Sequence, residues 1–540
     1  MMKKIVSVFL AAVMVFAAAF PVLAAPEGKS EYPIIRILGN GNEIYDEDGN
    51  LVYNFDYDTS QLANDVAQIC LPHLLTGLAT GDYSDYYDAL YEKISEIYGN
   101  AKLDENGEPL AGTDISKSER DYMAVRQNQN LGGKGYFNMG DYYFWYDWRL
   151  DPLQHADELN DYINHILKAT GKEKVSLYGR CIGGTPIIAY LAKYGSEKID
   201  TVCLDSTVTN GGEMIGDVFT GNLNLNTDAL LRFANGYFSG SDDSTGDMLF
   251  DIIISTVRLL NSAGVSEEII QLFMDNIYET LGDGFISAFT RASFATWPSY
   301  WTMVKADDFE KAKTVIFGEE DSELRKTYSG LIAKLDNYHD TVTSKMPEIL
   351  KHAKESGTKF CIISKYGYQL FPYVGSYDEL SDRWVSVKNS SYGATTALIN
   401  ETLSPEYIAQ KTEQGLGRYI SVDKEIDAST CYLPDNTWFI KGNNHDDWQD
   451  CIEALSYAVC ASDSMDVSTN EKYPQFMFYD SENRSLTALT EENMNCEDYY
   501  DFDTGSTETL SKKERLFKTL MVLFDWIKKI FTYLSSLFTK

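Results

Sequence analysis

The sequence predicts an α/β fold with a mostly parallel β-sheet, and two features of the chain indicate it. Strand-like and helix-like segments alternate in the first half of the chain, at 142–148, 153–170, 175–178, 183–194 and 199–204. Two further strand-like segments, each paired with a helical pattern, follow a long interruption: strands at 359–364 and 437–441, helices at 346–356 and 447–461. Such alternation is typical of parallel sheets, because each helix returns the chain to the same end of the sheet.

The interruption follows a different pattern and predicts an inserted helical region. It contains apolar helical segments at 248–260 and 269–281 and an aromatic-rich segment at 294–301. We therefore predict one α/β unit in two parts with a helical cap between them, at 26–207, 208–340 and 341–495.

The composition excludes two broad classes of protein. Of the 540 residues, 44% are hydrophobic and 13% aromatic, which is enough for a large core and excludes a mostly disordered chain. The net charge of −35 argues against a nucleic-acid partner, because such binding needs a basic face. We expect no nucleic-acid role.

The first 25 residues predict export. Lys3 and Lys4 precede an uncharged stretch at 5–25, and small residues at 24–25 offer a cleavage site. This pattern is typical of a secretory signal peptide, and the short Lys-rich start resembles a bacterial one. An uncleaved anchor is the alternative, since the stretch could span a bilayer. Either interpretation puts the body outside the cytoplasm, where the eight cysteines could form disulfides.

The last 45 residues predict a linker and a surface helix. Residues 496–510 are acidic, and 511–540 form a basic segment with one polar stripe and a wide apolar face. Lys528 and Lys529 near its middle argue against a transmembrane span. We expect an amphipathic helix that makes peripheral contact with an anionic membrane. Docking on the protein's own core is the alternative.

The segment 175–184 carries the strongest chemical signal. It reads as a strand, a sharp turn and a helix with the pattern Gly179-Arg180-Cys181-Ile182-Gly183. The nucleophile elbow of hydrolases has the pattern G-x-S-x-G in this context. A nucleophile held at positive φ leaves no room for side chains two residues away, which explains both glycines. The pattern therefore predicts Cys181 as a nucleophile; a glycine-rich turn with a buried cysteine is the alternative.

The rest of a triad is expected downstream, in the order acid and then histidine. His445 directly follows the strand at 437–441, at the sheet edge where Cys181 should lie, whereas His339 and His352 lie in or near helical segments. We predict His445 as the base. Asp382, after the strand at 359–364, is the favoured acid; Asp378 and Asp205 remain alternatives.

The oxyanion hole should be formed by two backbone N–H groups. The first is that of Ile182, the residue after the nucleophile. The second should come from the loop after an early strand, which fits Gly39-Asn40-Gly41, with Asn40 as the donor.

The motif Tyr146-Asp147-Trp148-Arg149 lies about 30 residues before the elbow, one strand–helix–strand unit away. This arrangement resembles the lecithin:cholesterol acyltransferase family of α/β-hydrolases, in which a Tyr-Asp-Trp-Arg strand precedes a Gly-His-Ser-x-Gly elbow. The segments around Asp382 and His445 are similar to the acid and histidine segments of that family. The resemblance implies an α/β-hydrolase fold and acyl transfer or ester hydrolysis on lipids. Asp147 and Arg149 should pair with each other or with nearby backbone.

Two positions depart from that family, which has His where Arg180 stands and Ser where Cys181 stands. The elbow also resembles that of polyhydroxyalkanoate synthases, which use a cysteine but are intracellular. We expect an exported acyl hydrolase or acyltransferase that acts on apolar or lipid esters through Cys181, His445 and Asp382. This chemistry needs no metal and no organic cofactor. A catalytically idle binding protein of the envelope is the second hypothesis.

Overall fold

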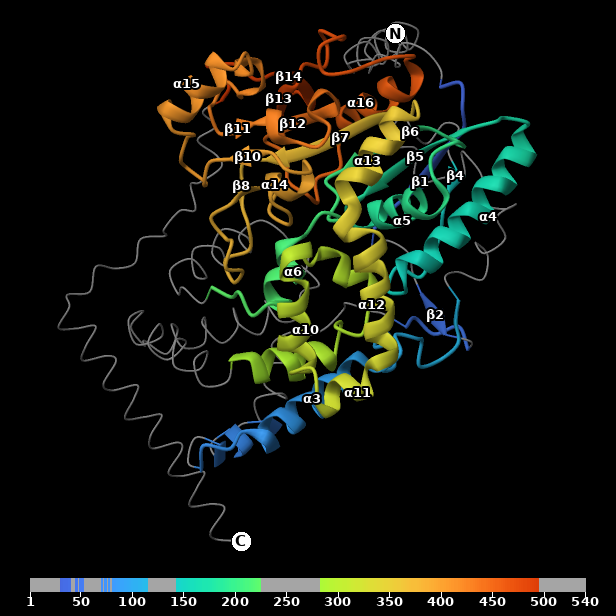
Figure 1. Cartoon of the computed structure of the whole chain (residues 1–540), viewed down its shortest axis with the longest axis vertical. Coiled ribbons are helices and arrows are strands. Elements are labelled where there is room, and N and C mark those ends of the chain that lie inside the picture. Colours follow the sequence, from blue (N-terminus) through green and yellow to red (C-terminus); the bar gives the residue numbers. More distant parts are fainter. Residues whose placement is uncertain are drawn as a thin grey trace, which may run out of the picture.

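The computed structural model describes most of the chain between residues 30 and 494 (Figure 1). The described residues are 30–39, 44–46, 48–52, 69–70, 72–74, 76–77, 80–114, 142–224 and 282–494. Several predicted segments lie outside them: the signal peptide at 1–25, the helices at 248–260 and 269–281, the linker at 496–510 and the helix at 511–540.

A mostly parallel sheet forms the centre of the described structure. Its eight strands lie in the order β14 (Ser485–Ala488), β13 (Phe476–Asp480), β12 (Thr437–Lys441), β7 (Lys359–Tyr366), β6 (Ile199–Asp205), β5 (Val175–Arg180), β1 (Ile34–Ile37) and β4 (Tyr142–Tyr143). Only the pair of β13 and β14 is antiparallel among these neighbours. The α/β architecture predicted from the alternation of segments is therefore confirmed.

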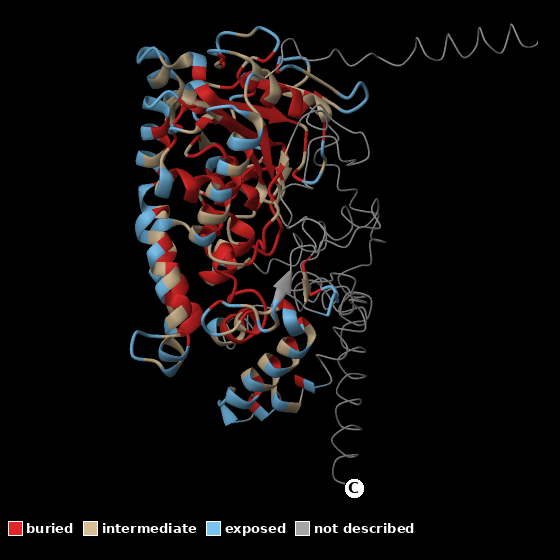
Figure 2. Ribbon diagram, turned by 90° about the vertical axis from the view of Figure 1, so that its right-hand side faces the viewer, coloured by how far each residue is buried: buried red, intermediate tan, exposed pale blue. Residues whose placement is uncertain are grey.

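Helices cover both faces of this sheet. They are α4 (Pro152–Thr170), α5 (Gly184–Tyr194), α13 (Met346–Glu355) and α16 (Asp450–Ala461). Val202 of β6 packs in the same core cluster as Ile187 of α5, whereas the next residue, Cys203, packs with Leu455 of α16. Because successive side chains of a strand point to opposite faces, α5 and α16 lie on opposite sides of the sheet. Buried residues fill the sheet between these helices (Figure 2).

The strand expected at 142–148 is much shorter than predicted. β4 ends at Tyr143, and the chain turns where the Leu150 amide donates to the Asp147 carbonyl at 3.1 Å. α4 then begins with the Asp151 carboxylate accepting the Leu153 amide at 2.9 Å. It ends at Thr170, and the next residue, Gly171, has a φ of 68° that suits glycine.

The regular elements described between β6 and β7 are all helical. They are α6 (Glu213–Phe219), helical residues 282–291, η4 (Pro298–Met303), η5 (Ala306–Asp308), α10 (Phe309–Phe317), α11 (Glu323–Thr327), α12 (Ser329–Thr341), η6 (Thr343–Lys345) and α13. α10, α11 and α12 extend away from the sheet and meet α3 (Ser84–Tyr98) at the far end (Figure 1). Within the described ranges, no helix has both the length and the apolar character needed to cross a bilayer.

Short elements connect the last parallel strands. They are β8 (Tyr368–Gln369), β9 (Leu380–Ser381), α14 (Val387–Ser390), β10 (Thr395–Thr396), α15 (Pro405–Glu413), η7 (Gly417–Tyr419), β11 (Ile426–Asp427), η8 (Ala428–Thr430) and η9 (Pro434–Asn436). The remaining described elements are η1 (Gly99–Ala101) and the small pair of β2 (Tyr45–Asp46) and β3 (Thr113–Asp114). The β8–β9 hairpin matters most for function, since Asp382 follows it directly.

Candidate active site

Cys181 occupies a strained turn at the carboxyl end of β5. Its φ is 54°, a left-handed conformation that residues other than glycine rarely adopt. A short 3₁₀ turn, η3 (Cys181–Gly183), then leads directly into α5. Non-glycine residues held at such angles often occur at functional sites.

The two glycines of the elbow motif have a steric reason. A Cβ on Gly183 would lie 2.1 Å from the Ile37 carbonyl oxygen of β1, and one on Gly179 would lie 2.9 Å from the Gly183 carbonyl oxygen. Both distances are too short for any side chain. The glycines thus allow β5, the turn and α5 to pack closely around the cysteine, as the sequence pattern predicts.

His445 lies in the loop after β12 and is held by Asp382. Its Nδ1 is 2.8 Å from Asp382 Oδ2, and its backbone amide donates to the Asp382 carbonyl at 2.9 Å. Asp382 is fully buried, and its Oδ1 accepts the amides of Trp384 and Val385 at 3.1 and 3.0 Å. These bonds fix the carboxylate, which in turn fixes the orientation of the imidazole.

The free end of the His445 imidazole lies beside Cys181. Burial alone would lower the pKa of His445, but the Asp382 carboxylate outweighs it, and the charge and hydrogen bonding of Cys181 add to the effect. Together they raise the pKa of His445 to about 10. Nε2 is buried and makes no formed hydrogen bond, so its interaction with Cys181 is one of proximity. Such contacts are often loose before substrate binds.

Asp205 and His339 have other partners. Asp205 accepts the Tyr178 hydroxyl at 2.8 Å and pairs with Lys365 at 3.3 Å; burial would raise its pKa, but Lys365 and Arg180 hold it below the usual value. His339 stacks on Phe309, with ring centres 4.3 Å apart. The carboxylate that contacts His445 is that of Asp382, and not that of Asp205 or Asp378.

One of the two expected oxyanion donors is described. Ile182 is buried in η3, whereas Asn40 lies outside the described residues. Its neighbour Gly39 lies against the elbow: a Cβ there would be 3.3 Å from the Cys181 Cβ. The Tyr146 hydroxyl donates to the Leu38 carbonyl at 3.1 Å and helps hold this loop in place.

The Tyr-Asp-Trp-Arg motif forms a buried ion pair. Arg149 binds Asp147 through Nε and Nη2 at 2.9 and 2.7 Å, and its Nη1 donates to the carbonyls of Asn100 and Ala101. The predicted pairing of Asp147 and Arg149 is therefore present. It ties the turn before α4 to η1.

Three further residues lie near His445, beyond the predicted catalytic and oxyanion residues. The Arg180 guanidinium donates to the His445 backbone carbonyl. Trp384 packs against the imidazole, with ring centres 6.0 Å apart, and its indole donates to Asp446 at 2.8 Å. Trp448 is 40% exposed and carries the Arg180 guanidinium on its ring. Only proximity to the motif residues could have indicated them.

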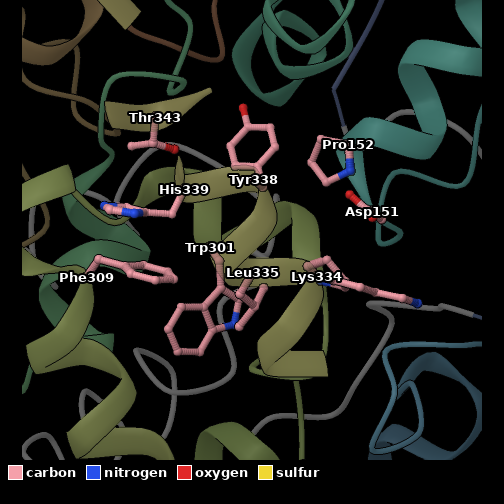
Figure 3. A pocket seen from close by; sticks show the side chains of 10 residues that line it. Asp151, Pro152, Trp301, Phe309, Lys334, Leu335, Tyr338, His339 and Thr343 are labelled. Carbon is pink, nitrogen blue, oxygen red and sulfur yellow. The ribbon is translucent and has the colours of Figure 1, made fainter. Parts of the chain in front are cut away.

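A separate pocket lies among the helices between β6 and β7. Asp151 and Lys334 lie on one side of it, and His339 and Phe309 on the other (Figure 3). The pocket has room for about one water molecule and contains none of the predicted site residues. It is therefore not a second candidate for a substrate site. Among the described residues, no group of His, Cys, Asp or Glu side chains is arranged to hold a metal ion.

The resemblance to the acyltransferase family rests on the motif residues of the sequence alone. Cys181, His445 and Asp382 come from three separate loops at the carboxyl ends of β5, β12 and the β8–β9 hairpin. No protein-family model matches this chain, and a search of curated proteins finds no match either.

Proposed function

We propose that the protein is an exported acyl hydrolase or acyltransferase of the α/β-hydrolase type, with Cys181 as nucleophile. One observation carries the proposal: the strained turn at Cys181 lies beside an imidazole that Asp382 holds in place. The helical region between β6 and β7 would act as a cap in such an enzyme. An idle binding protein would have no need to keep a cysteine at a φ of 54° next to a charged histidine.

The first half of the reaction forms a thioester. In this proposal Cys181 attacks as the thiolate of a thiolate–imidazolium pair with His445, as Cys–His nucleophiles do. Sγ bonds to the ester carbonyl carbon, and the carbonyl oxygen becomes an oxyanion. The Ile182 amide, and in this proposal that of Asn40, stabilise its charge. His445 Nε2 then protonates the leaving alcohol as the carbon–oxygen bond breaks.

The second half returns the enzyme to its starting state. Neutral His445 removes a proton from water or from an acceptor alcohol, whose oxygen attacks the thioester carbonyl. The carbon–sulfur bond breaks, and the thiolate is restored beside the protonated imidazole. Water gives hydrolysis, whereas an alcohol gives acyl transfer. No step draws on a metal or an organic cofactor.

The substrate class in this proposal is an apolar or lipid ester, and its support is the family resemblance. The aromatic segment 294–301 adds little, because its large side chains are buried against one another. Trp297 and Tyr300 have ring centres 4.8 Å apart, and Phe294 lies 5.9 Å from Tyr300. These rings form a core for the helical region and do not by themselves indicate an apolar ligand.

Location and membrane contact are part of the same proposal. Export rests on the pattern of residues 1–25, and peripheral membrane contact on the basic amphipathic pattern of 511–540. The membrane contact would bring the site close to lipid esters. Flotation with anionic vesicles of the full chain, compared with a chain ending at Gly505, tests it. The full chain should float and the shorter one should not; equal behaviour of the two contradicts the anchor.

A panel of acyl esters tests the catalytic proposal. Purified protein is given p-nitrophenyl esters of increasing chain length and a phospholipid, with and without an alcohol acceptor. We expect turnover that disappears in Cys181→Ala and that increases with chain length. The matched control is Cys451→Ala, which removes a half-buried thiol from α16 and should leave turnover unchanged. Turnover that survives in Cys181→Ala, or a folded protein inactive on every ester, would contradict the proposal.

A further inference from the structure

Arg180 is the residue directly before the candidate nucleophile, and it is almost completely buried. It is 8% exposed, and its guanidinium donates to the backbone carbonyl of His445, 265 positions later in the chain. The residue before Cys181 is thus bonded to the residue that carries the candidate base. One side chain joins the end of β5 to the loop after β12.

Stacking on an aromatic ring holds the Arg180 guanidinium in place, in addition to its hydrogen bond to His445. It lies over the Trp448 ring at 4.6 Å, and the Arg36 guanidinium lies over the same ring at 4.8 Å. Arg36 is fixed in turn by a buried ion pair with Glu453 at 2.7 Å. The planar guanidinium suits both stacking and a directed hydrogen bond, which a lysine ammonium could not combine.

The charges around Arg180 keep it cationic. Burial would lower its pKa, but Asp205 of β6, Tyr178 of β5, Cys181 and Asp446 of the histidine loop raise it. Lys365 of β7 and Arg36 of β1 are positive charges nearby; Asp205 pairs with Lys365, and Glu453 pairs with Arg36. Arg180 therefore remains a charged donor throughout the range in which His445 titrates.

The polar atoms of His445 are almost all held. The backbone amide and Nδ1 bond to Asp382, and the backbone carbonyl accepts from Arg180. Asp382 fixes the direction of the imidazole but belongs to a different loop from Cys181. The Arg180 bond starts from the residue next to Cys181, so it joins the elbow to the loop that carries His445.

We propose that Arg180 is a positioning residue that sets the separation between the Cys181 thiol and His445 Nε2. This inference rests on the proposed function, because it gives Cys181 and His445 their catalytic roles. It also accounts for arginine at a position where the similar family has histidine. Without the guanidinium, the loop after β12 keeps its bond to Asp382 but loses its link to the elbow.

The test measures thiol alkylation and turnover in Arg180→Gln and Arg180→Lys. Iodoacetamide labelling of Cys181 is followed from pH 5 to pH 10 by peptide mass spectrometry, together with kcat and KM for an ester substrate. We expect Arg180→Gln to need a higher pH for labelling and to lose about 10²-fold in kcat with little change in KM. Arg180→Lys keeps the charge but not the planar donor, so its loss should be intermediate, about tenfold.

A matched control separates positioning from general effects. Arg418 also lies over an aromatic ring, that of Tyr419 at 4.2 Å, and pairs with Asp435 at 2.9 Å, away from the site. Arg418→Gln should leave both the labelling profile and kcat unchanged. If Arg180→Gln does not fold, as judged by its thermal transition, Arg180→Lys carries the test alone.

His445→Ala distinguishes failure of this inference from failure of the proposed function. A labelling profile that does not change in His445→Ala contradicts the triad itself. A profile that shifts in His445→Ala but is wild-type in both Arg180 variants contradicts only the positioning role. Equal losses in kcat for the two Arg180 variants with unshifted labelling would also overturn it.

Discussion

Cysteines occur at two kinds of position around the central sheet: in its middle, and at the end of one strand. The two kinds of position differ in burial and in the charges nearby, and therefore in the reactivity of the thiol. Cys203 of β6 and Cys361 of β7 pair in register in the middle of their strands, and Cys460 of α16 lies 3.8 Å from Cys203. All three are buried. Cys181, in contrast, lies at the end of its strand, half-buried and beside a charged imidazole.

The comparison shows that place in the strand decides what a cysteine can do. In the middle of a strand, a thiol packs against neighbouring strands and helices, and burial raises the pKa of Cys203 well above its ordinary value. At the carboxyl end, the chain turns, and loops from other strands bring charged groups close. A thiolate is the reactive form, so only the second environment favours nucleophilic chemistry.

The largest expected difference is in turnover. Cys181→Ala should lower kcat by about 10⁴-fold or more, because the bond to the substrate can no longer form. Cys203→Ala should keep activity and lower the free energy of unfolding by about 1 kcal/mol. Ester turnover and urea unfolding measure the two effects.

A related prediction concerns the strained turn. Cys181→Gly should be more stable than Cys181→Ala, since glycine adopts a φ of 54° without strain.

The second expected effect tests the orientation of the imidazole. Asp382→Asn should lower kcat by about 10³-fold to 10⁴-fold, because an amide can donate to Nδ1 and favour the wrong tautomer. The matched variant is Asp378→Asn, four residues earlier in the same connection. Steady-state kinetics of the two variants compares them. A greater loss in Asp378→Asn would return that residue to the role of acid.

The third prediction compares the thiols directly. At pH 7 iodoacetamide should label Cys181 about 10²-fold faster than the buried cysteines. Cys451 is half-buried, but burial raises its pKa to about 11, so it should react slowly. Peptide mass spectrometry after timed labelling gives each rate. Equal labelling of Cys181 and Cys451 would mean that exposure alone, and not the imidazole, controls reactivity.

The last expected effect is the dependence of stability on pH. The pKa of His445 is about 10 in the folded protein and about 6.5 in an unfolded chain, so the protonated imidazole stabilises the fold. This contribution is complete below pH 6.5 and is lost as the pH rises toward 10. Urea unfolding from pH 6 to 10 should show a steeper loss of stability for the wild type than for His445→Gln. Parallel curves would mean that His445 does not titrate in this range.

The sequence predicted the features that depend on local pattern. The parallel strands follow from alternating apolar segments, and the elbow follows from the glycines around Cys181, whose Cβ atoms would clash with backbone. The position of His445 shortly after a strand predicts that it lies at this edge of the sheet, and its imidazole does contact Asp382 there. These choices needed only the rule that parallel strands end at one edge of the sheet.

Features that depend on contacts between distant loops were not predictable in the same way. The order of residues in the sequence leaves Asp382, Asp378 and Asp205 as possible acids. Only the fold shows that the Asp205 carboxylate pairs with Lys365 and accepts a hydrogen bond from Tyr178. The strand expected at 142–148 stops at Tyr143, and the Asp147–Arg149 pair lies further on, at the turn before α4. The Arg180 bond to His445 joins residues 265 positions apart, a distance at which no local pattern is informative.

The most direct test of the central claim is to trap the acyl-enzyme. The purified protein is mixed with a slowly hydrolysed acyl ester, quenched in acid within seconds, and analysed as intact protein and as peptides by mass spectrometry. We predict a mass increase of one acyl group, located on the peptide that contains Cys181 and removed by neutral hydroxylamine, as expected for a thioester. The adduct should form much more slowly in His445→Ala, because the attacking thiol has lost its imidazole partner. Turnover without any adduct, or an acyl group on another residue, would contradict Cys181 as the nucleophile.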